Sequence, residues 1–295
     1  MERRVILALV SGGIDSTAAA LRAREEFCDE PRSRGEEVEC FLYAASFLYG
    51  QSHGKEIECA KRFAERYGFK HVVISVGSLS ARALLGVDGA GSALTGDKPI
   101  PEAAEPGRVP ETYVPQRNLV LLSYAASILE MLIELHEAQL GIISVGFQAG
   151  DSAPGEPIYP DTRREFVDAV ELAINLGSGA AFEGRARIVV YAPWVDYPKW
   201  RIIEWCLRKG IDLGETWTCY RGGERPCGRC PACIHRLRSF VAAGSPDPLT
   251  PTYETLPDWY SRWVRDLEAC RAGDETACSR ARVATARARR NEVPS

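Results

Sequence analysis

The chain has 295 residues, of which 45% are hydrophobic and 26% are charged, and its formal net charge is -4 at pH 7. This composition is that of an ordinary globular protein and not of a disordered chain, and the length allows one large α/β domain with a small appendage. The weakly negative charge argues against direct nucleic-acid binding. We find no apolar run near the ~18 residues of a membrane span and no signal peptide, so we expect a cytoplasmic protein without a membrane partner.

The N-terminal stretch predicts a phosphate-binding turn. Residues 5–10 are apolar and predict a buried strand, Ser11-Gly12-Gly13 breaks it, and residues 14–24 predict a helix. A helix N-terminus after a glycine turn offers unpaired N–H groups and partial positive charge, which suit a phosphate. The alternative is an ordinary glycine turn. The residues predicted to bind ATP are Ala8, Leu9, Val10, Ser11, Gly12, Gly13, Ile14, Asp15, Ser16, Thr17 and Ala18.

Asp15 is the unusual residue of this turn, because a carboxylate repels a bound phosphate unless a cation lies between them. We interpret it as a residue on the side of a Mg²⁺ ion that accompanies ATP. The alternative is a helix cap. The segment lacks the Gly-x4-Gly-Lys-Ser/Thr pattern, so it is not the Walker loop of common nucleotide hydrolases.

The rest of the first 213 residues alternates between strand and helix patterns. This alternation predicts a doubly wound, mainly parallel α/β sheet, in which ligands bind at the carboxyl ends of the strands. The segment 28–37 contains Pro31 and Gly35 and is interpreted as a connection. The further strands are predicted at 38–47, 71–76, 141–147 and 187–192, and the further helices at 55–67, 119–136, 162–176 and 200–209.

Several polar or aromatic residues fall at these predicted strand ends. Phe47 and Tyr49 are placed to flank a purine ring, or are core residues. Arg117 precedes a helix that Asn118 is expected to cap, and a cation there suggests an anionic ligand, with a surface salt bridge as the alternative. Lys199 occupies a similar position and suits a polyphosphate.

Four of the ten cysteines lie close together in the pattern Cys219-x7-Cys227-x2-Cys230-x2-Cys233. Four thiolates within fifteen residues predict a closed tetrahedral site, which makes a structural zinc ion the favoured ligand. An iron–sulfur cluster is the alternative. His235 is interpreted as a bystander. Cys270 and Cys278 could pair, although their spacing alone does not establish a disulfide.

These motifs together resemble the 7-cyano-7-deazaguanine synthase family of the PP-loop ATP pyrophosphatase superfamily. The resemblance covers residues 5–240. It implies a homodimeric enzyme that converts 7-carboxy-7-deazaguanine and ammonia to the nitrile with ATP, Mg²⁺ and one structural zinc ion, in queuosine or archaeosine biosynthesis. The motifs are Ser-Gly-Gly-Ile-Asp-Ser at 11–16, Tyr-Gly-Gln-Ser-His at 49–53, Pro-Gln-Arg-Asn at 115–118, residues 146–151, Tyr-Pro-Asp at 159–161 with Arg163, and the cysteine cluster.

The resemblance implies catalytic roles for Asp15, Arg117 and Lys199, and a structural zinc site at Cys219, Cys227, Cys230 and Cys233. The residues implied to hold the substrate are Phe47, Tyr49, Gln51, Asp151, Asp161 and Arg163. Asp161 has the alternative role of N-cap for the helix 162–176. Two residues depart from the family pattern, because Thr162 and Pro198 stand where Cys and Ser are frequent.

Three units are expected: an ATP pyrophosphatase domain over 1–213, a zinc subdomain over 214–244 and an extension over 245–295. Within the extension, 245–251 is interpreted as a linker, 259–269 as a short amphipathic helix, and the rest as a frayed basic end or a partner contact. Other functions that share the loop are a tRNA thiolation enzyme and an enzyme that attaches deazaguanine to a protein. A third alternative is a nucleotide-binding zinc module without activity.

Overall fold

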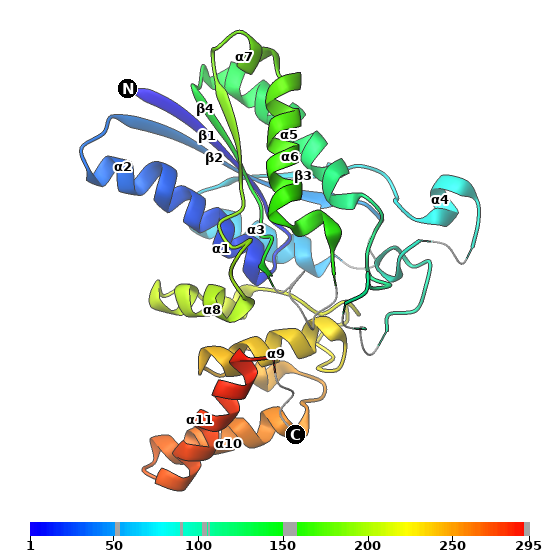
Figure 1. Cartoon of the computed structure of the whole chain (residues 1–295), viewed down its shortest axis with the longest axis vertical. Helices are drawn as coiled ribbons and strands as arrows, with labels where there is room; N and C mark the ends of the chain where they lie inside the picture. The colour runs from blue at the N-terminus through cyan, green and yellow to red at the C-terminus, as the bar shows by residue number, and fades with distance from the viewer. Residues whose placement is uncertain (51–53, 89–90, 102–104, 106, 150–157, 292–295) are drawn as a thin grey trace.

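The computed structural model describes residues 1–50, 54–88, 91–101, 105, 107–149 and 158–291. These residues form a five-stranded sheet of order β3-β2-β1-β4-β5, in which every neighbouring pair is parallel (Figure 1). The strands are β1 (Glu2–Leu9), β2 (Val38–Leu48), β3 (Lys70–Ser75), β4 (Leu140–Ser144) and β5 (Arg187–Tyr191). The predicted parallel, doubly wound fold is confirmed.

Helices cover both faces of the sheet, as expected for parallel strands that read as continuous apolar runs. One face packs on α1 (Ile14–Arg24) and α3 (Lys55–Tyr67), and the other on α5 (Arg117–His136) and α6 (Arg164–Gly177). Short elements connect them: α4 (Ala81–Leu85), α7 (Gly179–Phe182), and the 3₁₀ turns η2 (Ala93–Thr95), η4 (Pro160–Thr162) and η5 (Leu213–Glu215).

The segment after α1 is helical, so the predicted connection at 28–37 is wrong over its first half. A π-helical turn, η1 (Glu25–Asp29), continues into α2 (Glu30–Ser33). Pro31 lies in the first turn of α2 and cannot donate a backbone hydrogen bond to the preceding turn, where the Phe27 carbonyl oxygen accepts instead from Arg4 Nη1 at 2.7 Å. Within this region Cys28 and Cys40 form a disulfide that ties the helical segment to β2.

Helix α5 contradicts the expectation that the chain has no apolar run near the length of a membrane span. Its 20 residues are long and apolar enough to cross a membrane by length and composition, and it is the one such helix in the described part of the chain. It packs on β1 and β4 through Leu122, Ala125, Leu129 and Ile133. Its buried stripe therefore serves the core of this fold.

The C-terminal third forms a second, mainly helical layer at the end of the molecule away from α7 (Figure 1). It contains α8 (Lys199–Arg208), α9 (Pro231–Ala243), η6 (Thr250–Thr252), α10 (Asp258–Arg271) and α11 (Glu275–Arg289). Helices α10 and α11 pack on each other and on α9, and Cys270 and Cys278 form a disulfide between them. The possible pairing of these cysteines is confirmed.

Two expectations for the extension are wrong. Residues 245–251 are no free linker, because Asp247 is 1% exposed and both of its carboxylate oxygens accept hydrogen bonds from Arg236. The basic end is not frayed up to Arg289, since it forms α11. The guanidinium of Arg289 lies over the ring of Trp200 and donates to the carbonyl oxygen of Ala242. The extension therefore shares a core with the cysteine region, with Tyr260 and Trp263 buried in the same cluster.

Candidate active site

A cavity of about 330 Å³ lies at the carboxyl ends of the strands. The sheet order runs from β1 outward to β3 and then restarts with β4 on the other side of β1, so a topological switch point falls between β1 and β4. This is the place where open α/β sheets bind ligands. The predicted site residues that line the cavity are Leu9, Val10, Ser11, Gly13, Ile14, Asp15, Ser16, Phe47, Tyr49, Arg117 and Lys199.

Two glycines allow the backbone segments around the cavity to approach closely. Gly12 has φ +78°, and a Cβ atom there would lie 2.3 Å from the carbonyl oxygen of Glu56. A Cβ atom on Gly146, just after β4, would lie 2.5 Å from the backbone nitrogen of Ser16. Both contacts are too short for any other residue. The glycine turn is therefore packed between the start of α3 and the end of β4.

The N-terminus of α1 is open toward the cavity. Gly13 occupies the N-cap position and has no side-chain cap, so Asp15 is not a helix cap. Ser16 is held within the turn, because its Oγ accepts from the Ser11 nitrogen at 3.2 Å and donates to the Gly13 carbonyl oxygen at 3.3 Å. The first N–H groups of such a helix are available to an anion. Thr17 and Ala18 are buried behind the turn and do not line the cavity, and neither does Ala8.

Asp15 and Lys199 face each other across the floor of the cavity. Lys199 Nζ donates to Asp15 Oδ2 at 2.5 Å, and the two side chains are 8% and 21% exposed. Asp15 Oδ1 is buried and has no hydrogen-bond partner among the residues that the structure describes. A buried, unpaired carboxylate oxygen is a suitable ligand for a hard cation such as Mg²⁺. The donor set therefore fits the ion that was predicted beside Asp15.

Arg117 begins α5 and lies against Tyr49. Its Nη1 is 3.4 Å from the Tyr49 hydroxyl oxygen, and its guanidinium carbon is 5.5 Å from the centroid of that ring. The preceding residue, Gln116, has a left-handed φ of 54° that turns the chain into the helix. Arg117 thus presents a half-buried cation beside a helix N-terminus, an arrangement that favours an anion.

The capping arrangement at α5 differs from the predicted one. Asn118 was expected to cap α5 but lies inside the helix. Asp161 caps α5 instead, because its Oδ2 accepts a hydrogen bond from the backbone nitrogen of Asn118 at 3.3 Å. The start of α6 has Arg163 at its N-cap and no side-chain cap, so Asp161 does not cap the helix that follows it. Burial raises the pKa of Asp161, and the charge of Arg117 opposes that rise.

The remaining predicted substrate residues do not gather at the cavity in the part that the structure describes. Gln51 and Asp151 lie outside the described residues. Arg163 is exposed, and its Nε donates to the carbonyl oxygen of Pro160 at 3.2 Å. Asp161 lies behind Arg117 and is not among the residues that line the cavity. Thr162, one of the two departures from the family pattern, does line it.

A glutamate and a histidine of the cavity wall were not predicted as site residues. Glu56 lines the cavity from the first turn of α3, the helix that follows β2 in the chain. Burial raises its pKa to about 7, and the charge of Arg117 offsets part of that rise. His235 of α9 also lines the cavity. The useful signal for Glu56 is its position, because a helix that starts at a strand's carboxyl end turns its first residues toward the ligand edge.

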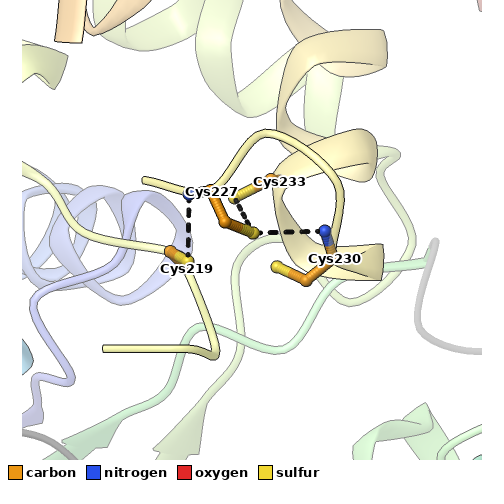
Figure 2. A group of neighbouring side chains, drawn as sticks. All are labelled: Cys219, Cys227, Cys230 and Cys233. Carbon is orange, nitrogen blue, oxygen red and sulfur yellow. Dashed lines mark hydrogen bonds between the residues drawn. The ribbon is translucent and has the colours of Figure 1, made fainter. Parts of the chain in front are cut away.

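The four predicted cysteines converge on one point beside the cavity (Figure 2). All are buried, and their Sγ atoms lie within 4.8 Å of one another. The Cys227 and Cys230 nitrogens donate to the sulfurs of Cys219 and Cys227 at 3.4 and 3.3 Å. Gly228 makes the turn possible, since it has φ +72° and a Cβ atom there would lie 1.6 Å from the Thr255 carbonyl oxygen. This cluster could hold a metal ion.

The cysteine region also forms part of the cavity wall. The backbone nitrogen of Trp217 donates to the Gly12 carbonyl oxygen at 2.8 Å and so joins the region to the glycine turn. Thr218, Tyr220 and His235 line the cavity from the same side. A metal ion in the cluster would therefore hold one wall of the site in place.

Comparisons with known proteins identify the family. The model of the family described as queuosine biosynthesis protein QueC matches residues 5–244. A 7-cyano-7-deazaguanine synthase from Clostridium kluyveri is 37% identical over 251 residues, which cover 84% of this chain and 97% of that protein. The synthase of the same name from Thermoplasma acidophilum is 34% identical over 267 residues, which cover 90% of this chain and 98% of that protein.

Solved structures give only a distant likeness. The U34-tRNA thiolase NcsA from Methanococcus maripaludis, solved with its [4Fe-4S] cluster, is 13% identical with a TM-score of 0.36 and coverage of 93% of this chain and 74% of that chain. The match of the family model over residues 5–244, together with relatives above 30% identity over most of both chains, shows that the chain belongs to the QueC family of queuosine biosynthesis proteins.

Proposed function

We propose that the protein is a 7-cyano-7-deazaguanine synthase, which converts 7-carboxy-7-deazaguanine and ammonia to the nitrile at the expense of ATP. The observation that supports this most is the Asp15–Lys199 pair beside an uncapped helix N-terminus, in a cavity at the switch point of the sheet. It is an arrangement suited to a nucleotide polyphosphate and its cation. The named activity of the relatives supplies the substrate class.

The chemistry explains why such a site is needed. A carboxylate is a poor electrophile, so its oxygen first attacks the α-phosphorus of ATP and expels pyrophosphate. Ammonia then displaces AMP from the acyl adenylate and gives the amide. A second adenylation, on the amide oxygen, allows loss of AMP and leaves the nitrile. The protein mainly holds the reactants in place and neutralises phosphate charge.

We assign roles according to position. The turn at Ser11–Ser16 holds the pyrophosphate through backbone N–H groups and hydroxyls, while Lys199 and Arg117 balance the charge that develops on the phosphates. Phe47 and Tyr49 flank the ring of a nucleobase. Asp161 does not contact the substrate itself. It positions Arg117, because it caps α5 and lies beside that arginine. Gln51, Asp151 and Arg163 remain candidate contacts of the deazaguanine.

We assign one structural Zn²⁺ to Cys219, Cys227, Cys230 and Cys233. Zn–S bonds of about 2.3 Å in a tetrahedron place the sulfurs about 3.8 Å apart. Cys227 Sγ and Cys233 Sγ are 4.0 Å apart, and all four sulfurs lie within 4.8 Å. An iron–sulfur cluster of several irons separates its thiolates further, so the compact cluster favours zinc. The catalytic cation is Mg²⁺, which Asp15 Oδ1 would contact together with the phosphates of ATP.

The rival thiolation activity finds less support in the cavity. Sulfur transfer needs a reactive cysteine at the site, and none of the described residues that line this cavity is a cysteine. We therefore propose that the protein makes a small-molecule precursor of queuosine or archaeosine in the cytoplasm and does not bind tRNA directly.

We further propose a homodimer formed through the outer faces of α5, α6 and α7. These faces expose apolar side chains in stripes of helical spacing, among them Met131 and Leu135 on α5, Leu172 and Leu176 on α6, and Phe182 at the end of α7, which is 89% exposed. Exposed apolar side chains on neighbouring helices are typical of a contact with a second copy. A Phe182→Glu/Leu176→Glu double variant should run as a monomer in sedimentation, and an unchanged mass would contradict this interface.

The activity is tested by AMP release. Purified protein with ATP and Mg²⁺ should release AMP and pyrophosphate only when 7-carboxy-7-deazaguanine is present. AMP formation that ignores this acid, or ADP in place of AMP, would contradict the proposal.

A further inference from the structure

Glu56 is a carboxyl group in the cavity wall for which the roles assigned above leave no function. It lies in the first turn of α3, and its carbonyl oxygen packs so closely on Gly12 that a Cβ atom there would lie 2.3 Å away. The first turn of α3 is therefore fixed against the glycine turn. Glu56 consequently has a defined position beside the proposed ATP site.

The charged neighbours of Glu56 leave its carboxylate available. Arg117 faces it from α5 and Tyr49 from the end of β2, while Arg117 donates its own hydrogen bonds to Tyr49 and Asn118. Among the described residues, no side chain donates a hydrogen bond to the Glu56 carboxylate. The other carboxylate of the cavity wall, Asp15, is already bound to Lys199. Burial raises the pKa of Glu56 to about 7, near the pH at which a base works best.

The proposed reaction requires a proton acceptor. Attack of ammonia on the acyl adenylate forms a C–N bond, breaks the C–O bond to AMP, and leaves a nitrogen that must lose one proton to become the amide. Adenylation of the amide oxygen forms an O–P bond, expels pyrophosphate and releases a second N–H proton. Loss of the second AMP breaks the remaining C–O bond and releases the third proton as the nitrile forms. Adenylation of the carboxylate releases no N–H proton.

We propose that Glu56 is the catalytic base that accepts the N–H protons as the acyl adenylate becomes the amide and the amide becomes the nitrile. The proton passes from nitrogen to a Glu56 carboxylate oxygen and then to bulk water before the next step. The inference rests on the proposed function, and it predicts that Glu56 serves the nitrogen steps and not the first adenylation.

The test compares Glu56→Gln with Glu58→Gln, which removes an exposed carboxylate two residues further along the same helix. Two reactions are measured: ATP–pyrophosphate exchange that depends on the carboxylate substrate, and single-turnover conversion of the amide intermediate to the nitrile. We expect Glu56→Gln to keep the exchange within about twofold of the wild type and to slow nitrile formation by about 10²–10⁴-fold. Glu58→Gln should match the wild type in both reactions.

The pH profile separates a base from a structural residue. Wild-type nitrile formation should rise with pH through about 7, because Glu56 accepts protons only when it is ionised. The rate of Glu56→Gln should not show this rise with pH. Glu56→Asp, which keeps a carboxylate, should be faster than Glu56→Gln and should again show a rise with pH. The other charged groups that face this part of the cavity are unchanged in these variants, so a rise with pH that is lost only in Glu56→Gln belongs to Glu56. They are Arg117, Tyr49, Asp15, Lys199 and His235.

Each remaining outcome is decisive. Normal nitrile formation by Glu56→Gln would overturn the inference. Equal loss of exchange and nitrile formation, or a raised KM for the carboxylate in the exchange, would show a binding or structural role and overturn it as well. A wild type without carboxylate-dependent exchange would instead refute the proposed function, and the inference with it.

Discussion

Lys199 Nζ donates to Asp15 Oδ2 at 2.5 Å, and this contact joins the glycine turn after β1 to the first residue of α8. A lysine at a helix N-terminus is opposed by the helix dipole. Asp15 balances that charge in the absence of a nucleotide, and phosphate oxygens can share it when ATP binds. Under the proposed function, the pair would bring a cation to the phosphates of ATP, where negative charge must be neutralised.

Replacing Asp15 with Asn should reduce AMP formation by at least about 10²-fold, because the variant loses the oxygen that would face Mg²⁺ and the charge that positions Lys199. The fold should stay intact, but the melting temperature should fall, because the mostly buried Lys199 loses its counter-ion. Asp196→Asn, which removes the exposed partner of Arg164, is the matched control and should retain full activity. AMP formation by Asp15→Asn at the wild-type rate would refute the assigned role.

The fold was predictable where local patterns decide it. The apolar runs of β1 and β4, the helical period of α3 and its stop at Gly68 are properties of short stretches, and the structure follows them. The glycine turn and the cysteine spacing likewise led to the cavity and to the cluster of thiols.

The parts that were missed depend on partners far away in the sequence. Asp161 caps a helix that begins 44 residues earlier at Arg117, so inspection of its own helix assigned it the wrong role. Asp247 reads as a linker residue but is buried by its bond to Arg236. Glu56 looks like an ordinary helix residue until the sheet places it in the cavity wall. The roles of Asp161 and Asp247 leave no local signal, whereas Glu56 could be found from its place in the first turn of a helix that follows a strand end.

The Arg236–Asp247 pair should make the C-terminal extension essential for stability. The side chains are 1% and 0% exposed, and Arg236 also donates to Thr216 Oγ1 at 2.8 Å and to the Leu213 carbonyl oxygen at 3.0 Å. Asp247→Asn should cost about 3–5 kcal/mol in the free energy of unfolding, because it leaves a buried guanidinium without its counter-ion.

Chemical denaturation measures this loss of stability. Asp266→Asn is a suitable control, because it breaks the ion pair between Asp266 and Arg280, which is more exposed than the Arg236–Asp247 pair. A loss below about 1 kcal/mol for Asp247→Asn would be typical of a surface pair and would contradict the account.

Loss of one cysteine ligand should remove the metal. Purified wild-type protein should contain one zinc ion per chain and no acid-labile sulfide, whereas Cys230→Ser should contain little zinc and melt at a lower temperature. Elemental analysis and calorimetry give both values. Cys206→Ser, at a buried cysteine outside the cluster, controls for the loss of a thiol. Stoichiometric iron with sulfide in the wild type would show that the site holds a cluster instead.

Glu56 should also leave a signature in the pH dependence of stability. Its pKa is raised from 4.5 to about 7 in the folded chain, so the folded state binds more protons than the unfolded state between these values. The contribution of Glu56 to stability is therefore complete below about pH 4.5 and is lost as pH rises through about 7. Denaturation curves should show that Glu56→Gln gains stability relative to the wild type from pH 5 to 8. A difference that does not vary with pH would indicate a normal pKa.

The most direct test of the central claim follows the nitrogen atom. The protein is incubated with ATP, Mg²⁺, 7-carboxy-7-deazaguanine and ¹⁵N-ammonium, and the products are analysed by mass spectrometry and nucleotide chromatography. The account predicts the nitrile with one ¹⁵N atom and two AMP for each nitrile, because the carboxylate and the amide are each adenylated once. Attachment of the deazaguanine to a protein, or AMP release without incorporation of ¹⁵N, would contradict it.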